Sequence, residues 1–199
     1  MKPTIKPKSR IAMQKILALL LVSTLATACS PITVQDYSDF QPSLKPEVFF
    51  DGYLSAHGVV KDRGGRVIRT FNADIEASWE NNVGTLVEDF LFDDGEVQQR
   101  IWTLTPQGDG SYIGDAGDVV GPGELELSGN SLFLNYVLRI PYGDSTIDVR
   151  VDDRMYLVSP DVLINESTLH KFGVRVGSLD LVILRQPTKP SYSVPRGDQ

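Results

Sequence analysis

The sequence of 199 residues carries 26 acidic and 19 basic side chains, which give it a formal charge of −7 at pH 7. Five of the basic residues lie before residue 16 and no acidic residue precedes residue 29, so the chain after residue 28 has a formal charge of −12. Nucleic-acid binding needs clustered lysine and arginine, so this balance argues against a nucleic-acid partner. It also argues against adhesion to an anionic membrane surface.

The chain begins with the basic stretch, which is followed by an apolar run, Ile16–Val22, and by small and apolar residues up to Ala28. This is the pattern of a secretory signal peptide with small residues at its cleavage site. The run is too short for a membrane-spanning helix, which needs about 20 apolar residues. The single cysteine, Cys29, follows directly, and the junction resembles a bacterial lipobox. We therefore predict that residues 1–28 are a lipoprotein signal peptide, with Met13 as an alternative start.

The lipobox resemblance implies that Cys29 carries acyl chains such as palmitate and anchors the protein to a membrane. Each buried methylene contributes about 0.8 kcal/mol, so that one chain anchors marginally whereas two or three hold firmly. Ser30, and not aspartate, follows the cysteine. By resemblance to the sorting rule of enteric-type Gram-negative bacteria, this favours the outer membrane, with the protein facing the periplasm. No cysteine then remains for a disulfide or a thiolate nucleophile.

Two terminal segments rich in proline flank the rest of the chain. We predict that residues 29–46 form a lipidated cysteine and a flexible tether that spans about 20–25 Å. Tyr37 and Phe40 in this segment could dock on the domain. Residues 187–199 predict a flexible C-terminal tail. The segment between them, residues 47–186, is long enough for one domain with a hydrophobic core.

This central segment alternates between apolar and polar residues again and again, which is the pattern of half-buried strands. In Val67–Trp79 the odd-numbered residues are mostly apolar and the even-numbered ones polar. The same pattern predicts further strands at Phe49–Val60, Thr85–Phe92, Glu96–Thr105, Ser111–Ala116, Glu124–Leu127, Leu132–Ile140, Thr146–Leu157 and Leu179–Leu184. Turn signals rich in glycine and aspartate separate the strands. The one helical turn that we predict is Pro160–Leu163.

Eight to ten antiparallel strands in one domain form either a closed barrel or a sandwich. Short hairpins between sequential strands favour the barrel, which also removes exposed sheet edges. The polar faces carry charges, among them Asp74, Glu76 and Asp148, that a lipid-facing band of a membrane pore would not tolerate. We predict an all-β fold, an antiparallel up-and-down barrel of about 8–10 strands that is lipocalin-like (calycin-type).

No motif in the sequence specifies a metal, a cofactor or a nucleophile. His57 and His170 have no metal-ligand spacing, and neither a nucleophile elbow nor a phosphate loop is present. The acidic turn Asp93–Glu96 lacks the ligand spacing of a calcium loop, so it is interpreted as a hairpin turn. We predict no metal and no cofactor.

The candidate site consists of charged and aromatic side chains that the alternation places on inward faces. Glu88 shares its face with Leu86 and Phe90, and buried charges cost several kcal/mol unless they are paired. We predict that these residues line the barrel interior: Arg69, Trp79, Glu88, Arg100, Trp102 and Asp153. One interpretation is a buried ion pair that fixes the register of the strands. The other is a ligand site in which Arg100 binds a carboxylate at two points and apolar walls hold an acyl chain.

Five short motifs together resemble a known family. They are Phe49-Phe50-Asp51-Gly52, Arg100-Ile101-Trp102, Ala116-Gly117-Asp118-Val119-Val120-Gly121, Asp152-Asp153-Arg154-Met155-Tyr156 and Lys171-Phe172-Gly173. From about Tyr37 to Arg185 the chain resembles a family of small proteobacterial lipoproteins that is classed as a domain of unknown function. Arg154 and Glu166 stand where the family pattern has Trp and Arg. The resemblance implies no established activity, but an association with genes for enzymes that modify membrane fatty acids implies a lipid ligand.

We therefore expect a non-enzymatic lipoprotein that binds a fatty acid or a similar amphiphile inside its barrel. Two alternatives stay open. The first is a structural or assembly partner in the cell envelope, whose barrel is filled by side chains. The second is an enzyme that acts on membrane lipid, with Glu88 or an aspartate as a general base poised by burial.

Overall fold

The computed structural model describes residues 30–190. The predicted signal peptide, Cys29 and residues 191–199 of the predicted tail lie outside the described residues. The chain divides into two units, Met1–Thr33 and Val34–Gln199, and the second contains all the helices and strands described below.

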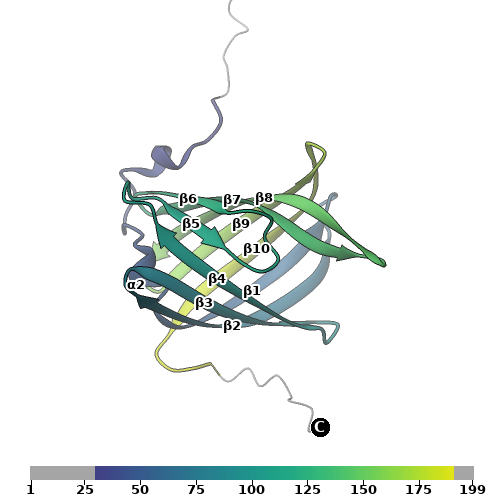
Figure 1. Cartoon of the computed structure of the whole chain (residues 1–199), viewed down its shortest axis with the longest axis horizontal. Helices are drawn as coiled ribbons and strands as arrows, with labels where there is room; N and C mark the ends of the chain where they lie inside the picture. Colours follow the sequence, from purple (N-terminus) through teal and green to yellow (C-terminus); the bar gives the residue numbers. More distant parts are fainter. Residues whose placement is uncertain (1–29, 191–199) are drawn as a thin grey trace, which may run out of the picture. The chain divides into compact units, whose positions relative to one another are not determined.

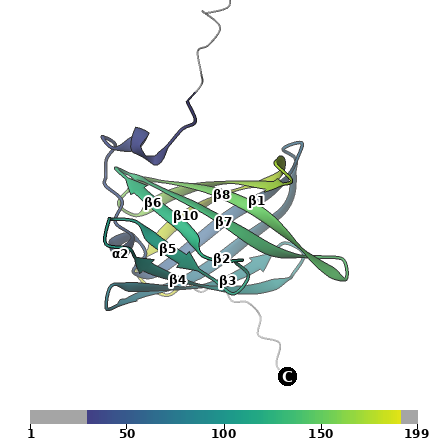
Figure 2. The same cartoon turned by 45° about the horizontal axis from the view of Figure 1, so that its top comes forward.

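Ten antiparallel strands form a closed barrel, shown in two views in Figures 1 and 2. The strands are β1 (Gly52–Asp62), β2 (Val67–Glu80), β3 (Val83–Phe92), β4 (Val97–Pro106), β5 (Tyr112–Asp115), β6 (Gly123–Ser128), β7 (Ser131–Tyr142), β8 (Ser145–Ser159), β9 (Val162–Lys171) and β10 (Val174–Gln186). Each strand pairs with its neighbours in sequence, and β1 pairs with β10 to close the barrel. The predicted lipocalin-like (calycin-type) up-and-down barrel is confirmed.

The two ends of the barrel differ. The short helix α2 (Pro46–Phe49) lies at one end, which we call the α2 end, and the β7–β8 hairpin extends past the opposite end, which we call the hairpin end (Figures 1 and 2). Phe49 and Phe50 are buried, and the indole Nε1 of Trp79 donates a hydrogen bond to the Phe50 carbonyl at 2.6 Å. Aromatic packing therefore covers the core at the α2 end.

The segment before α2 is packed against the barrel, which differs from the flexible tether predicted there. It contains a 3₁₀ helix, η1 (Val34–Tyr37), in which Val34 is buried, and farther on Leu44 is buried as well. The Leu44 amide donates to the carbonyl of Gly129 at 2.8 Å. Tyr37 packs edge-on against Phe133 of β7. These apolar side chains gain burial on the barrel wall, which offsets the entropy that a free tether would keep.

The strand β9 was not predicted, and the predicted helical turn at Pro160–Leu163 is wrong. Pro160 and Asp161 form the turn between β8 and β9, and the strand begins at Val162. Two of the inward positions of this strand are polar, Asn165 and Ser167, and both are buried. Polar residues on the core face break the alternation that identifies a strand in a sequence.

The barrel wall is irregular between β4 and β7, because β5 and β6 are short. Only Thr103–Pro106 of β4 pair with β5. Nearer the hairpin end, the loop 116–122 takes the place of a strand: Val119 forms an isolated bridge with Leu138 of β7, and the Arg139 amide donates to the Asp118 carbonyl at 2.8 Å. This loop brings the Asp118 side chain next to the barrel interior.

Candidate functional site

Charged side chains from opposite walls of the barrel meet in its interior. Glu88 on β3 lies opposite Arg100 on β4 in the strand register. From the other wall, Asp153 on β8 lies opposite Ser167 on β9. Alternation along each strand turns these side chains toward the core together with apolar neighbours. A polar cluster therefore sits inside an apolar barrel.

The cluster borders an interior cavity of about 110 Å³. Its polar lining consists of Glu88, Arg100, Tyr136, Asp153, Asn165 and Ser167. The remaining lining consists of Ala56, Phe71, Ile75, Phe90, Trp102, Leu134, Met155, Leu179, Leu181 and Ile183. Because liquid water takes about 30 Å³ per molecule, the cavity has room for a few waters or a small chemical group.

Arg100 is held by Asp118 of the loop 116–122. Its Nε lies 3.1 and 3.0 Å from the two Asp118 carboxylate oxygens, and its Nη2 lies 2.7 Å from Oδ2. Burial disfavours the charge of Arg100, but the bond to Asp118 and the charge of Glu88 outweigh it and raise the Arg100 pKa. The guanidinium is therefore permanently charged, and one of its edges is already occupied by a carboxylate.

The carboxyl groups of Glu88 and Asp153 are perturbed by their surroundings. Burial raises the pKa of Glu88 to about 7, and the charge of Arg100 opposes that rise only in part. Part of the Glu88 side chain faces the cavity, where water can reach it. Burial also raises the pKa of Asp153 to about 6, against the lowering effect of its neighbours Ser167 and Tyr136. Near neutral pH, Glu88 therefore exchanges between its charged and neutral forms.

Two buried polar atoms that belong to cavity-lining residues have no hydrogen-bond partner within the described residues: Oδ1 of Asp153 and Nδ2 of Asn165. The two side chains are 6% and 3% exposed. An unpaired buried donor or acceptor costs about 1–3 kcal/mol. Such atoms mark a place where a bound group can find hydrogen bonds.

Two aromatic side chains of the cavity lining, Trp102 and Tyr136, pack against each other next to the polar cluster. Trp102 is buried, and its ring packs edge-on against Tyr136 with centroids 5.3 Å apart. Gly114 and Gly123 make room for this packing, since a Cβ at Gly114 would lie 3.3 Å from the Trp102 ring and one at Gly123 would lie 3.2 Å from Tyr136. Burial, reinforced by the charge of Asp153, raises the pKa of Tyr136, so its hydroxyl stays protonated.

The structure thus brings four of the six predicted site residues to one cavity and leaves two elsewhere. Glu88, Arg100, Trp102 and Asp153 line the cavity. Arg69 does not reach it, and its Nη2 instead bonds Asp94 at 2.7 Å and Glu96 at 2.5 Å in the β3–β4 turn.

Both outlying residues have local partners that explain their positions. The Arg69 guanidinium carbon lies 3.6 Å from the ring centroid of Phe92, and the β3–β4 turn supplies its acidic partners, Asp94 and Glu96. Trp79 lies at the α2 end, where its indole hydrogen bond to Phe50 holds it away from the charged cluster.

The sequence analysis missed several members of the cluster. Tyr136 alternates with apolar residues on a predicted strand, so its inward position could have been read from the pattern. Asn165 and Ser167 belong to the strand that was not predicted. Asp118 was noticed only as part of a motif, and no local pattern pairs a loop residue with an arginine 18 positions earlier.

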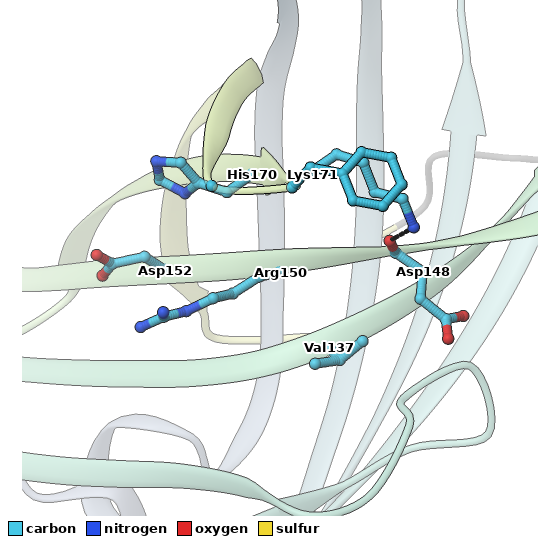
Figure 3. Close-up of a pocket in the computed structure, with 8 residues that line it drawn as sticks. Val137, Asp148, Arg150, Asp152, His170 and Lys171 are labelled. Atoms are coloured by element: carbon cyan, nitrogen blue, oxygen red, sulfur yellow. Dashed lines mark hydrogen bonds between the residues drawn. The ribbon is translucent and has the colours of Figure 1, made fainter.

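A larger hollow, of about 530 Å³, lies on the outside of β7, β8 and β9 (Figure 3). Arg150, Asp152 and His170 extend to one side of it, and Lys171 bonds the backbone carbonyl of Asp148. The Asp148 carboxylate is also held by Arg139, through bonds of 2.7 and 3.0 Å. The polar groups that line this outer hollow are largely paired or exposed to solvent, so the interior cavity is the stronger candidate for a binding site.

Within residues 30–190, no group of three or more histidine, cysteine, aspartate or glutamate side chains is arranged to hold a metal ion. The same part of the chain contains no helix that is long and apolar enough to cross a membrane.

Two solved structures from different organisms share the fold of this chain. The S-type phycobiliprotein lyase CPES from Guillardia theta matches with a TM-score of 0.55 and 13% identity, over 80% of this chain and 100% of that one. Rv2717c from M. tuberculosis matches with a TM-score of 0.52 and 15% identity, over 74% of this chain and 99% of that one. At these identities the likeness shows the fold alone.

Sequence comparison places the chain in a family. No curated protein matches the sequence. A family model does match, however, over residues 23–185, which is most of the chain and includes all the cavity-lining residues. The predicted resemblance to an uncharacterised family is confirmed: the chain belongs to the family described as Protein of unknown function (DUF3833).

Proposed function

We propose that this protein is a non-enzymatic binding protein, anchored through Cys29 to the outer membrane and facing the periplasm, whose barrel binds a fatty acid or a related amphiphile. The observation that carries this proposal is the interior cavity, where unpaired polar atoms of Asp153 and Asn165 are enclosed by apolar walls. A head group that pairs with these atoms removes the cost of leaving them buried and unpaired.

The size of the cavity limits what it can hold. At about 110 Å³ it is smaller than the 300–1,000 Å³ typical of pockets for drug-sized ligands. It therefore accommodates a head group and its first carbons. The alkyl chain would extend toward the hairpin end, along apolar side chains that pack on the core but are only partly buried: Leu138, Ile140, Ile147, Leu169 and Leu181.

The expected anchor supplies the location. Cys29 precedes Val34, the first residue of the barrel unit, by five positions. Five residues span at most about 18 Å. Lipidation of Cys29 would therefore keep the barrel next to a bilayer, which is a source of amphiphilic ligands.

Native mass spectrometry of the full-length protein, purified from its own membranes, tests the binding function. We expect a non-covalent amphiphile in addition to the lipid attached at Cys29. Ala56→Leu adds bulk to the cavity wall and should abolish the bound species. Val59→Leu places a leucine on the same strand but outside the cavity lining, and should keep it. An amphiphile that is absent from the wild type, or retained equally in both variants, contradicts the proposal.

One observation favours a second function, that of a structural or assembly partner. Three large apolar side chains near the hairpin end are well exposed: Phe172 is 92%, Tyr142 68% and Ile68 60% exposed. Exposed apolar groups of this kind often mark protein contacts. A photo-reactive amino acid at position 172 should then crosslink to one defined protein in living cells, and the purified barrel should carry no amphiphile.

A further inference from the structure

The charges around the cavity do not balance. Among the described residues, Arg100 is the only basic side chain that lines the cavity, and it is paired with Asp118 through three short contacts. Glu88 and Asp153 line the same cavity and have no basic partner of their own among the described residues. A ligand carboxylate that entered the cavity would therefore add a further negative charge to a region that already has an excess of them, and like charges at such short range repel strongly.

Arg100 is not available to offset that repulsion. Its Nε and Nη2 both contact the Asp118 carboxylate, so this edge of the guanidinium is occupied. The rest of the guanidinium lies in the field of Glu88, which stands opposite it in the register. A ligand carboxylate could bind Arg100 at two points only by displacing Asp118 or by lying against Glu88. The structure thus disfavours the carboxylate-binding role predicted for Arg100.

The unpaired atoms indicate what the cavity can recognise. Oδ1 of Asp153 accepts hydrogen bonds, and Nδ2 of Asn165 donates them. The two residues come from the neighbouring strands β8 and β9 and both line the cavity. A group that both donates and accepts a hydrogen bond satisfies both atoms without adding a charge.

We infer that the cavity selects an uncharged head group that donates and accepts hydrogen bonds, such as a hydroxyl or an amide, and rejects a free carboxylate. This inference rests on the proposed binding function and narrows its ligand class, because it excludes the fatty acid anion and keeps the related neutral amphiphiles. Among amphiphiles, it favours fatty alcohols, fatty amides and related neutral lipids over fatty acid anions. The Asp118–Arg100 ion pair is the feature that makes the cavity unfavourable for a carboxylate.

Three ligands with the same chain and different head groups test the inference: dodecan-1-ol, dodecanamide and dodecanoate. Their affinities are measured at pH 8 by calorimetry on the full-length chain with Cys29→Ser, which carries no acyl group of its own. We expect the alcohol and the amide to bind at least tenfold more tightly than dodecanoate. Dodecanoate that binds as tightly as the neutral ligands overturns the inference but leaves the binding function intact. If none of the three ligands binds, the binding function itself fails.

The variant Asp118→Asn tests the role of the ion pair. It releases the Arg100 guanidinium, and we expect dodecanoate affinity to rise at least fivefold while dodecan-1-ol affinity stays within twofold. Asp148→Asn is the matched control, because Asp148 forms a similar two-point ion pair with Arg139 on the outside of the barrel. An Asp118→Asn protein that keeps its far-ultraviolet circular dichroism but gains no dodecanoate affinity also overturns the inference.

Discussion

At the scale of single residues, the raised pKa of Glu88 links the stability of the barrel to pH. Glu88 has a carboxyl group that burial holds partly protonated at neutral pH, because burial raises its pKa from 4.5 to about 7. In the folded state the proton is therefore bound more tightly than in the unfolded chain. The contribution of Glu88 to stability is therefore greatest below about pH 4.5, falls as pH rises from about 4.5 to about 7, and levels off above that range.

Glu88→Gln should remove much of this dependence, since glutamine resembles the neutral acid at every pH. We expect the variant to be more stable than the wild type at pH 8 by about 1–3 kcal/mol, and close to the wild type at pH 5. Urea unfolding at both pH values measures the difference. Glu126→Gln, on an exposed position of β6, is the control. A wild type that is as stable at pH 8 as at pH 5 contradicts the raised pKa of Glu88.

Gly58 is a second residue with a specific packing role. A Cβ at this position would lie 2.4 Å from Cζ of Phe71 and 2.8 Å from Cβ of Leu181. We expect Gly58→Ala to destabilise the protein by about 1–3 kcal/mol through overpacking, as measured by thermal or urea unfolding. Gly117→Ala should have a far smaller effect, because a Cβ there meets no atom within 4 Å.

At the scale of elements, the segment from Val34 to α2 behaves as part of the barrel. Its docking depends on Gly129, where a Cβ would lie 1.8 Å from the Tyr37 carbonyl oxygen. Gly129 also has a φ of 54°, and Gly143 at the tip of the β7–β8 hairpin has a nearly equal φ of 57°. The two glycines share the same backbone strain on substitution but differ in their contacts.

Gly129→Ala should therefore release the segment 34–46, whereas Gly143→Ala should not. Limited proteolysis and hydrogen exchange of this segment measure the effect, and we expect faster cleavage and faster exchange in Gly129→Ala alone. Cleavage and exchange of this segment at the wild-type rate in Gly129→Ala would contradict the role of Gly129 in its docking.

The strands also show which elements could be predicted from the sequence. Nine of the ten strands were predicted, because their inward positions are mostly apolar. The tenth, β9, was not, because Asn165 and Ser167 occupy inward positions where a core strand normally has apolar residues. The strand that the alternation failed to predict, β9, is therefore one that supplies polar groups to the cavity.

At the scale of the whole molecule, the proposed lipid anchor at Cys29 would place the barrel at a membrane. We predict that Cys29 incorporates labelled palmitate and that the protein fractionates with the outer membrane. Cys29→Ser should abolish both labelling and membrane association. Ser30→Asp should keep the label and move the protein to the inner membrane. Labelling that persists in Cys29→Ser would contradict lipidation at this residue.

The sequence by itself determined the barrel and the inward-facing charges, because alternation along a strand is a local property that each residue carries with its neighbours. It also predicts the lipidation site, Cys29. Only the tertiary structure decided which charges meet. Arg69 found partners in a nearby turn, whereas Arg100 found Asp118 in a loop that replaces a strand in the wall. Pairing between distant segments depends on register and loop path, and these follow from the closure of the barrel and not from any local pattern.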